Sequence, residues 1–134
     1  MRLRFAQTPT VAIAAAAAFA ALIGVEAALA APTAAPSFKQ DVLPILNQHC
    51  IQCHSEGHIG FQSIGLDLTT YQGVMNGSQR GRAVIPRQPQ MSPLVKVLDW
   101  SKDTYPHMPA NQHQLDKKDV DTISAWVAAG AKDN

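Results

Sequence analysis

The 134-residue chain predicts an all-α domain with long loops. Two segments, one near residue 40 and one close to the C-terminus, space their apolar residues as one face of a helix does. Glycine and proline recur between them, and few runs alternate apolar and polar residues as half-buried strands do. These observations favour a first and a last helix joined by irregular connections.

The first 30 residues have the composition of a secretory signal peptide. Arg2 and Arg4 make the start positive, residues 11–25 are uncharged and rich in alanine, and Ala28-Leu29-Ala30 offers a cleavage site of small residues. The apolar run, about 15 residues, is shorter than the roughly 20 that span a bilayer. We therefore expect cleavage after Ala30 and export to the periplasm, with membrane association only if the leader is kept.

Charge is balanced in the remaining chain. Removal of Arg2, Arg4 and Glu26 from the 11 Lys+Arg and 10 Asp+Glu leaves nine of each. No basic patch suggests a nucleic-acid partner, and no lysine-rich face suggests docking steered by charge alone. Residues 31–36 are small residues and two prolines, which predict a linker, so the domain is expected at residues 37–134.

The first helix is expected to begin after Ser37. Ser37 and Gln40 have the spacing of a capping box. Pro44 should remove a hydrogen bond to Gln40 and bend the helix. The apolar face, expected to be core, comprises Phe38, Val42, Ile45 and Leu46.

The middle of the chain is expected to be mostly loop. Residues 55–66 contain three glycines and predict a loop. Residues 67–76 predict a short helix capped by Asp67 or Thr69 and ended by Gly77. Residues 77–93 again predict a loop.

Two further helices are expected after this loop. One covers residues 92–98, with Ser92 as N-cap and Pro93 at the first helical position. Residues 100–114 predict a loop, and the last helix should open at Asp116 and stop at Gly130. Leu115 should pack on Val120 as a hydrophobic staple. The inward faces comprise Leu94, Val95 and Leu98, and then Val120, Ile123, Trp126 and Val127; Trp100 is also expected to be core.

Cys50-Ile51-Gln52-Cys53-His54 is a C-x-x-C-H motif, which is typical of c-type haem attachment. Two thiols at this spacing can bond to the two vinyl groups of one haem, and the next imidazole can bind the iron. The chain has two cysteines, both in this motif. The motif predicts one covalent haem c, with Cys50 and Cys53 as thioether residues and His54 as proximal axial ligand.

Three other interpretations compete with haem attachment. The cysteines could form a disulfide or a thioredoxin-like redox pair, but no βαβ pattern surrounds them. They could be half of a zinc site, although structural zinc takes four ligands, usually including more than two cysteines. The motif could also be a coincidence.

The sixth iron ligand would decide the function. Met108 lies between Pro106 and Pro109, and these prolines restrict the backbone around it. We expect Met108 to be the distal axial ligand, with His107 and then His113 as rivals. The other candidates are Met75, Met91 and His58. Three loop arginines could pair with haem propionates, although a solvated loop needs the same residues: Arg80, Arg82 and Arg87.

The ordered motifs resemble small class I cytochrome c domains, most closely the planctomycete-type cytochrome c domain. The matching segments, which span Phe38 to Ala131, are Val42-Leu43-Pro44-Ile45-Leu46, Cys50 to His54, Gly65-Leu66-Asp67-Leu68, Ser92-Pro93-Leu94, Met108-Pro109 and Trp126-Val127-Ala128-Ala129-Gly130-Ala131. The resemblance implies an all-α cytochrome c fold, with the N- and C-terminal helices packed around one covalent haem, and His54 and Met108 as axial ligands. Family members often have Pro-Gly where this chain has Pro86-Arg87.

The expected function is electron transfer by a single-haem carrier, with Fe(III)/Fe(II) cycling between redox partner proteins. Any catalysis would reside in a partner, so the chain itself is not expected to be an enzyme. One alternative is a haem-based gas sensor or ligand-binding module with an open sixth position. Another is a fixed electron-transfer subunit of a larger redox complex.

Overall fold

The computed structural model describes residues 34–103, 106–110 and 113–134. These residues belong to the unit Pro32–Asn134. The predicted signal peptide, residues 1–30, and the first half of the predicted linker lie outside the described residues. Within the described ranges, no helix is long and apolar enough to cross a membrane.

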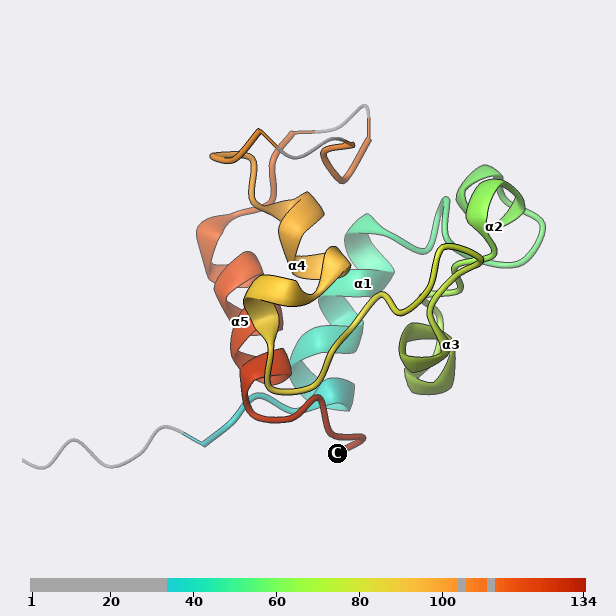
Figure 1. The fold of residues 1–134 in the computed structure, drawn as a ribbon. Helices are drawn as coiled ribbons and strands as arrows, with labels where there is room; N and C mark the ends of the chain where they lie inside the picture. Colours follow the sequence, from blue (N-terminus) through green and yellow to red (C-terminus); the bar gives the residue numbers. More distant parts are fainter. Residues whose placement is uncertain (1–33, 104–105, 111–112) are drawn as a thin grey trace, which may run out of the picture. The chain divides into compact units, whose positions relative to one another are not determined.

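The elements follow one another as short helices joined by longer connections. In chain order they are η1 (Phe38–Val42), α1 (Leu43–His49), α2 (Ile59–Ile64), α3 (Tyr71–Asn76), η2 (Pro89–Met91), α4 (Pro93–Leu98) and α5 (Lys117–Ala128) (Figure 1). Among the described residues, the one β-type pairing is an isolated bridge between Ser78 and Gly81. The prediction of a helical domain is therefore confirmed for this part of the chain.

The first helix begins after its N-cap Ser37, as predicted. The Ser37 hydroxyl accepts a hydrogen bond from the Gln40 amide at 3.2 Å. The reciprocal bond of the predicted capping box involves Asp41 instead, because the Ser37 amide donates to its carboxylate at 2.7 Å. The first turn, η1, is a π-helix, which places Pro44 in the first turn of α1. A proline is tolerated there because no intrahelical partner awaits its missing N–H. The disturbance expected at Pro44 thus takes the form of a change in helix type.

Helix α2 corrects the prediction that residues 55–66 form a loop. This helix has only six residues and no side-chain cap, and it contains Gly60. Such a short segment has little helix propensity of its own, so its helical conformation depends on packing. Gly65 ends the helix in the left-handed conformation, with φ +68°. Its Ile64 packs against the main hydrophobic core.

Helix α3 starts later than predicted, at Tyr71. Thr70 is its N-cap, and the Thr70 hydroxyl accepts from the Gly73 amide at 3.0 Å. Asp67 instead bonds the Thr69 amide and hydroxyl, at 2.9 and 2.7 Å. The carboxylate is therefore used in a turn before the helix. Gly77 ends α3 as predicted, with a positive φ of +80°.

Helix α4 begins at Pro93 as predicted, but Ser92 does not cap it with its side chain. The buried Ser92 hydroxyl accepts from the Ile85 amide at 2.8 Å and donates to the Gln88 carbonyl at 2.9 Å or the Ile85 carbonyl at 3.2 Å. Ser92 thus ties the preceding loop to the start of α4.

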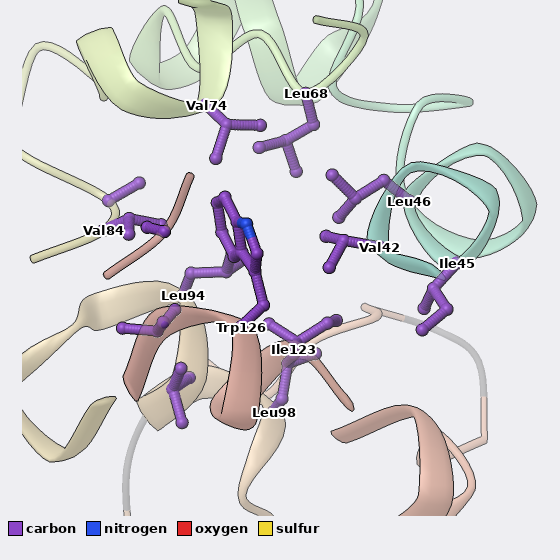
Figure 2. Close-up of a cluster of buried hydrophobic side chains, with 14 of the residues drawn as sticks. Val42, Ile45, Leu46, Leu68, Val74, Val84, Leu94, Leu98, Ile123 and Trp126 are labelled. Carbon is purple, nitrogen blue, oxygen red and sulfur yellow. The ribbon is translucent and has the colours of Figure 1, made fainter. Parts of the chain in front are cut away.

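The last helix, α5, packs against η1 and α4. Figure 2 shows the Trp126 indole surrounded by side chains from several other elements, among them Leu46 of α1 and Val74 of α3. Phe38 lies against Trp126 with ring centroids 5.4 Å apart and against Tyr71 at 5.3 Å. All predicted apolar residues of α5 are buried except Val120, which is partly buried.

The last residue, Asn134, joins the end of the chain to the first helix. Its side-chain oxygen accepts from the Phe38 amide at 2.9 Å. Its backbone carbonyl accepts from the Lys39 amide at 3.0 Å and from the Ser37 hydroxyl at 2.5 Å. These bonds satisfy amide groups that the first turn of a helix leaves without intrahelical partners.

Candidate cofactor site

The C-x-x-C-H motif forms a tight turn directly after α1. The Cys50 amide bonds the Leu46 carbonyl at 2.8 Å, which continues the helix by one residue. The Cys50 carbonyl then accepts from both the Cys53 amide at 3.1 Å and the His54 amide at 2.9 Å. Two thiols and one imidazole are thereby presented from a single turn.

Both cysteines are free thiols in different surroundings. Cys53 is exposed, whereas Cys50 is half-buried and packs against the core. Burial, and to a lesser extent the neighbouring Cys53, raises the pKa of the Cys50 thiol to about 11. The free thiols give the disulfide interpretation no support. The zinc interpretation has none either, because no group of three or more His, Cys, Asp or Glu in the described ranges could hold a metal ion.

The His54 imidazole is buried, with 9% of the residue exposed. Burial lowers the pKa of His54, and the backbone carbonyl of Leu66 partly opposes this shift. Nδ1, which lies beside Gly60 of α2, has no hydrogen-bond partner among the described residues. A buried imidazole that stays neutral keeps a nitrogen lone pair, which suits a metal ligand.

Gly60 of α2 packs directly against the motif. A Cβ at this position would lie 2.7 Å from the Cys53 carbonyl oxygen and 2.9 Å from both Cε1 and Nδ1 of His54. The Phe61 amide also donates to the Cys53 carbonyl at 3.1 Å. Helix α2, which the sequence did not predict, therefore supports one side of the imidazole ring.

Met108 lies on a separate loop and packs, partly buried, against the same core cluster as Cys50. Its amide donates to the Val97 carbonyl at 2.8 Å, and its carbonyl accepts from the Trp100 indole N–H at 2.8 Å. Trp100 was predicted to be a core residue, but it is only half-buried and contacts this loop. Trp100 lies eight residues before Met108, and no local pattern links two residues at this spacing, so the sequence offered no signal for the contact.

The rivals of Met108 lie in other environments. His107 stacks on Trp100, and its Nε2 lies 3.2 Å from the Lys102 carbonyl. His58 is exposed, with Nδ1 3.0 Å from the Ser55 hydroxyl. Met91 is 55% exposed. The remaining two are Met75, partly buried against the core, and His113, exposed.

The three loop arginines, Arg80, Arg82 and Arg87, are all exposed. Within the described part of the chain, none forms a salt bridge, so the structure assigns them no carboxylate partner. Arg87 adopts a positive φ of +64°, the left-handed conformation that glycine prefers. The Pro86-Arg87 turn thus has the backbone that a Pro-Gly turn would have.

The donor set as a whole fits a covalently held haem: two free thiols and a buried imidazole on one turn, with a thioether against the same core. Residues 50–111 match the family model described as Planctomycete cytochrome C. This segment is a planctomycete-type cytochrome c domain. The resemblance expected from the ordered motifs is confirmed.

The match of residues 50–111 to a cytochrome c family model has two general consequences. Cytochrome c domains generally bind haem c covalently, and the family suggests a haem electron-transfer role for this chain. The comparisons with curated proteins and with solved structures found no significant match.

Proposed function

We propose that this cytochrome c is an exported, periplasmic electron carrier with a single haem. Cys50 and Cys53 would hold the haem by thioethers, and His54 and Met108 would be the axial ligands. When bound, the haem supplies the Fe(III)/Fe(II) couple. The observation that carries the proposal is the buried His54 imidazole on the same turn as two free thiols.

The residues of this chain would hold the ligands in a fixed geometry. His54 is kept neutral by burial, which leaves a nitrogen lone pair available for the iron. Hydrogen bonds hold both the amide and the carbonyl of Met108, so the side chain extends from a backbone whose position is fixed. A methionine ligand raises the reduction potential relative to two histidines.

The proposal needs no catalytic base or nucleophile in this chain. Electrons would pass to and from redox partner proteins, in which any catalysis would reside. The balanced charge predicted for the exported part means that these partners are not selected by one strong electrostatic field.

The deciding experiment is a visible absorption spectrum of the oxidised and reduced holoprotein, for wild type and for Met108→Ala. Sulfur-ligated ferric haem c has a weak long-wavelength band. We expect this band in wild type and its loss in Met108→Ala. Met91→Ala is the matched control, because Met91 is exposed and should leave the band unchanged.

Other outcomes would identify the rival functions. A wild-type protein without the band, whose reduced form binds carbon monoxide readily, would have an open sixth position and would be a sensor or ligand-binding module. A protein without covalently bound haem would contradict the carrier and the sensor alike. Stable co-purification with a redox enzyme would indicate a fixed subunit.

A further inference from the structure

Trp100 contacts two consecutive residues of the Met108 loop in two different ways. Its indole N–H donates to the Met108 carbonyl at 2.8 Å. Its ring stacks on the His107 imidazole, with centroids 5.2 Å apart and planes 18° from parallel. One side chain thus restrains both of the residues that the sequence makes the leading candidates for sixth ligand.

The hydrogen bonds at Met108 fix its main chain relative to α4. The amide is held by the carbonyl of Val97, inside α4, and the carbonyl is held by Trp100, two residues after the helix ends. Without the indole bond, the Met108 peptide would keep only the amide contact. The Met108 side chain would then extend from a backbone with more rotational freedom. This freedom weakens any bond of the thioether that depends on the direction of the side chain.

The His107 imidazole is restrained by its surroundings. One face is covered by the Trp100 ring, and Nε2 lies at hydrogen-bond distance, 3.2 Å, from the Lys102 carbonyl. Both contacts must be broken before this ring can turn toward another partner. Imidazole is a common iron ligand, so an unrestrained His107 would compete with its neighbour Met108.

We infer that Trp100 is a positioning residue that selects Met108 over His107 as the sixth ligand. The inference rests on the proposed His/Met ligation. The indole N–H holds the methionine backbone in place, while the ring face holds the histidine away. These two effects belong to different parts of the side chain, and different substitutions separate them.

Trp100→Phe keeps an aromatic face for His107 and removes the N–H donor. In the ferric holoprotein we expect the long-wavelength band to remain, while the affinity for added cyanide rises about fivefold to tenfold, as loss of one hydrogen bond allows. The matched control is Trp126→Phe, which also removes an indole bond to a backbone carbonyl, that of Lys132 at 3.0 Å. This control should lower stability and leave the band unchanged.

Trp100→Leu removes both the donor and the stacking face. We expect loss of the long-wavelength band, because His107 replaces Met108 on the iron, and a fall in reduction potential. The double variant Trp100→Leu/His107→Ala should regain the band, because the competing imidazole is gone. A purely structural role for Trp100 would lose the band in both proteins, so the rescue distinguishes selection from general support.

The outcomes separate this inference from the proposed function. If wild type lacks the band, the proposed ligation is wrong. If wild type has the band, and cyanide affinity in Trp100→Phe equals that of wild type, the hydrogen bond does not position Met108. If the double variant fails to regain the band, His107 is not the competitor. Where Trp100→Leu gives too little folded protein, Trp100→Phe still decides whether the indole hydrogen bond positions Met108.

Discussion

Gly60 shows at the scale of a single residue how the proximal side of the site is built. It lies on a helix that begins without a cap, in a position where alanine would be the better helix former. The glycine is nevertheless required, because the His54 ring and the Cys53 carbonyl occupy the space of a side chain. Local propensity predicted a loop at this position. The structure is decided instead by the contact of Gly60 with Cys53 and His54 of the C-x-x-C-H motif.

We expect Gly60→Ala to destabilise the holoprotein by up to about 2 kcal/mol. Overpacking costs about 1–3 kcal/mol, and the gain in helix propensity returns about 1 kcal/mol of it. Urea unfolding followed by circular dichroism measures the difference. Ser63→Ala in the same helix is the control, because this exposed hydroxyl bonds only the Ile59 carbonyl of its own helix. Equal or greater stability of Gly60→Ala would show that the close approach is relaxed in solution.

At the scale of elements, the turn at Pro86-Arg87 shows a residue in a conformation that its type disfavours. The Gln88 amide bonds the Ile85 carbonyl at 3.0 Å, and Arg87 occupies the third position of this turn with φ +64°. A type II turn requires a positive φ at that position, which is why glycine is preferred there. The Arg87 amide also bonds the Val127 carbonyl of α5 at 2.8 Å, which fixes the turn against the last helix.

Arg87→Gly should therefore stabilise the protein by about 0.5–1 kcal/mol. The left-handed conformation costs a non-glycine residue about 1–2 kcal/mol, while glycine adds about 0.5–1 kcal/mol of unfolded-state entropy. The bond to Val127 uses the backbone and is kept. Thermal unfolding measures the effect, and Arg82→Gly is the control, since Arg82 is exposed and has no positive φ. A lower midpoint for Arg87→Gly would mean that the arginine side chain makes a stabilising contact.

The turn after α4 depends on an ionised carboxylate. Asp99 accepts from the Lys102 ammonium at 2.7 Å, and from the Ser101 hydroxyl at 2.5 Å and amide at 3.2 Å. Lys102 first and Ser101 second lower the pKa of Asp99 to about 2. Because the folded-state pKa is the lower one, the unfolded state takes up the proton first as the pH falls.

Asp99→Asn should accordingly be less stable than wild type at pH 7, and this difference should shrink as the pH falls below about 4 toward 2. The turn stabilises the charged form of Asp99. Its contribution to the free energy of unfolding is therefore fully present above the unfolded-state pKa and is lost as the pH falls through the folded-state pKa. Urea midpoints across this pH range measure it. Asp103→Asn, at an exposed neighbour with no salt bridge to a described residue, controls for the change in net charge. A difference that stays constant with pH would contradict the assigned role.

Helix boundaries show how far local patterns reach. The apolar faces of η1–α1 and α5 were predicted because burial repeats at helical spacing over several turns. The predicted N-cap of α3, Asp67 or Thr69, is three residues or one residue too early, because Thr70 caps the helix. All three side chains can cap, and only the folded chain distributes their hydrogen bonds. The hydroxyl of Ser92 likewise serves a loop seven residues earlier in place of its own helix.

At the scale of the whole molecule, the first and last helices are joined by aromatic packing and by the hydrogen bonds of Asn134. The C-x-x-C-H turn follows α1 directly, so the pairing that positions α1 also positions the motif. The sequence predicted the helix pair and the C-x-x-C-H donors, because both are local patterns. It did not predict the bonds of Asn134 or the Trp100–Met108 contact, since these join residues whose spacing follows no period.

We expect Asn134→Ala to destabilise the protein by about 1 kcal/mol, the typical worth of one hydrogen bond. The substitution removes the oxygen that accepts from the Phe38 amide at 2.9 Å. Asn134→Asp keeps an acceptor and adds a negative charge near a helix N-terminus, where it is favourable. Denaturant unfolding should place Asn134→Asp at or above wild type. Equal stability of Asn134→Ala and wild type would show that water replaces this bond at no cost.

The proximity of Asn134 to Ser37 also allows the order of the helices along the chain to be changed. A few added residues would connect these two positions, and new ends could be opened between the exposed Gln79 and Arg80, at the turn closed by Ser78 and Gly81. Such a rearrangement is tolerated when the two joined positions are adjacent and the new ends lie at an exposed loop tip. In a circular permutant of residues 37–134, α5 would precede α1 in synthesis, and the C-x-x-C-H turn would form after α5.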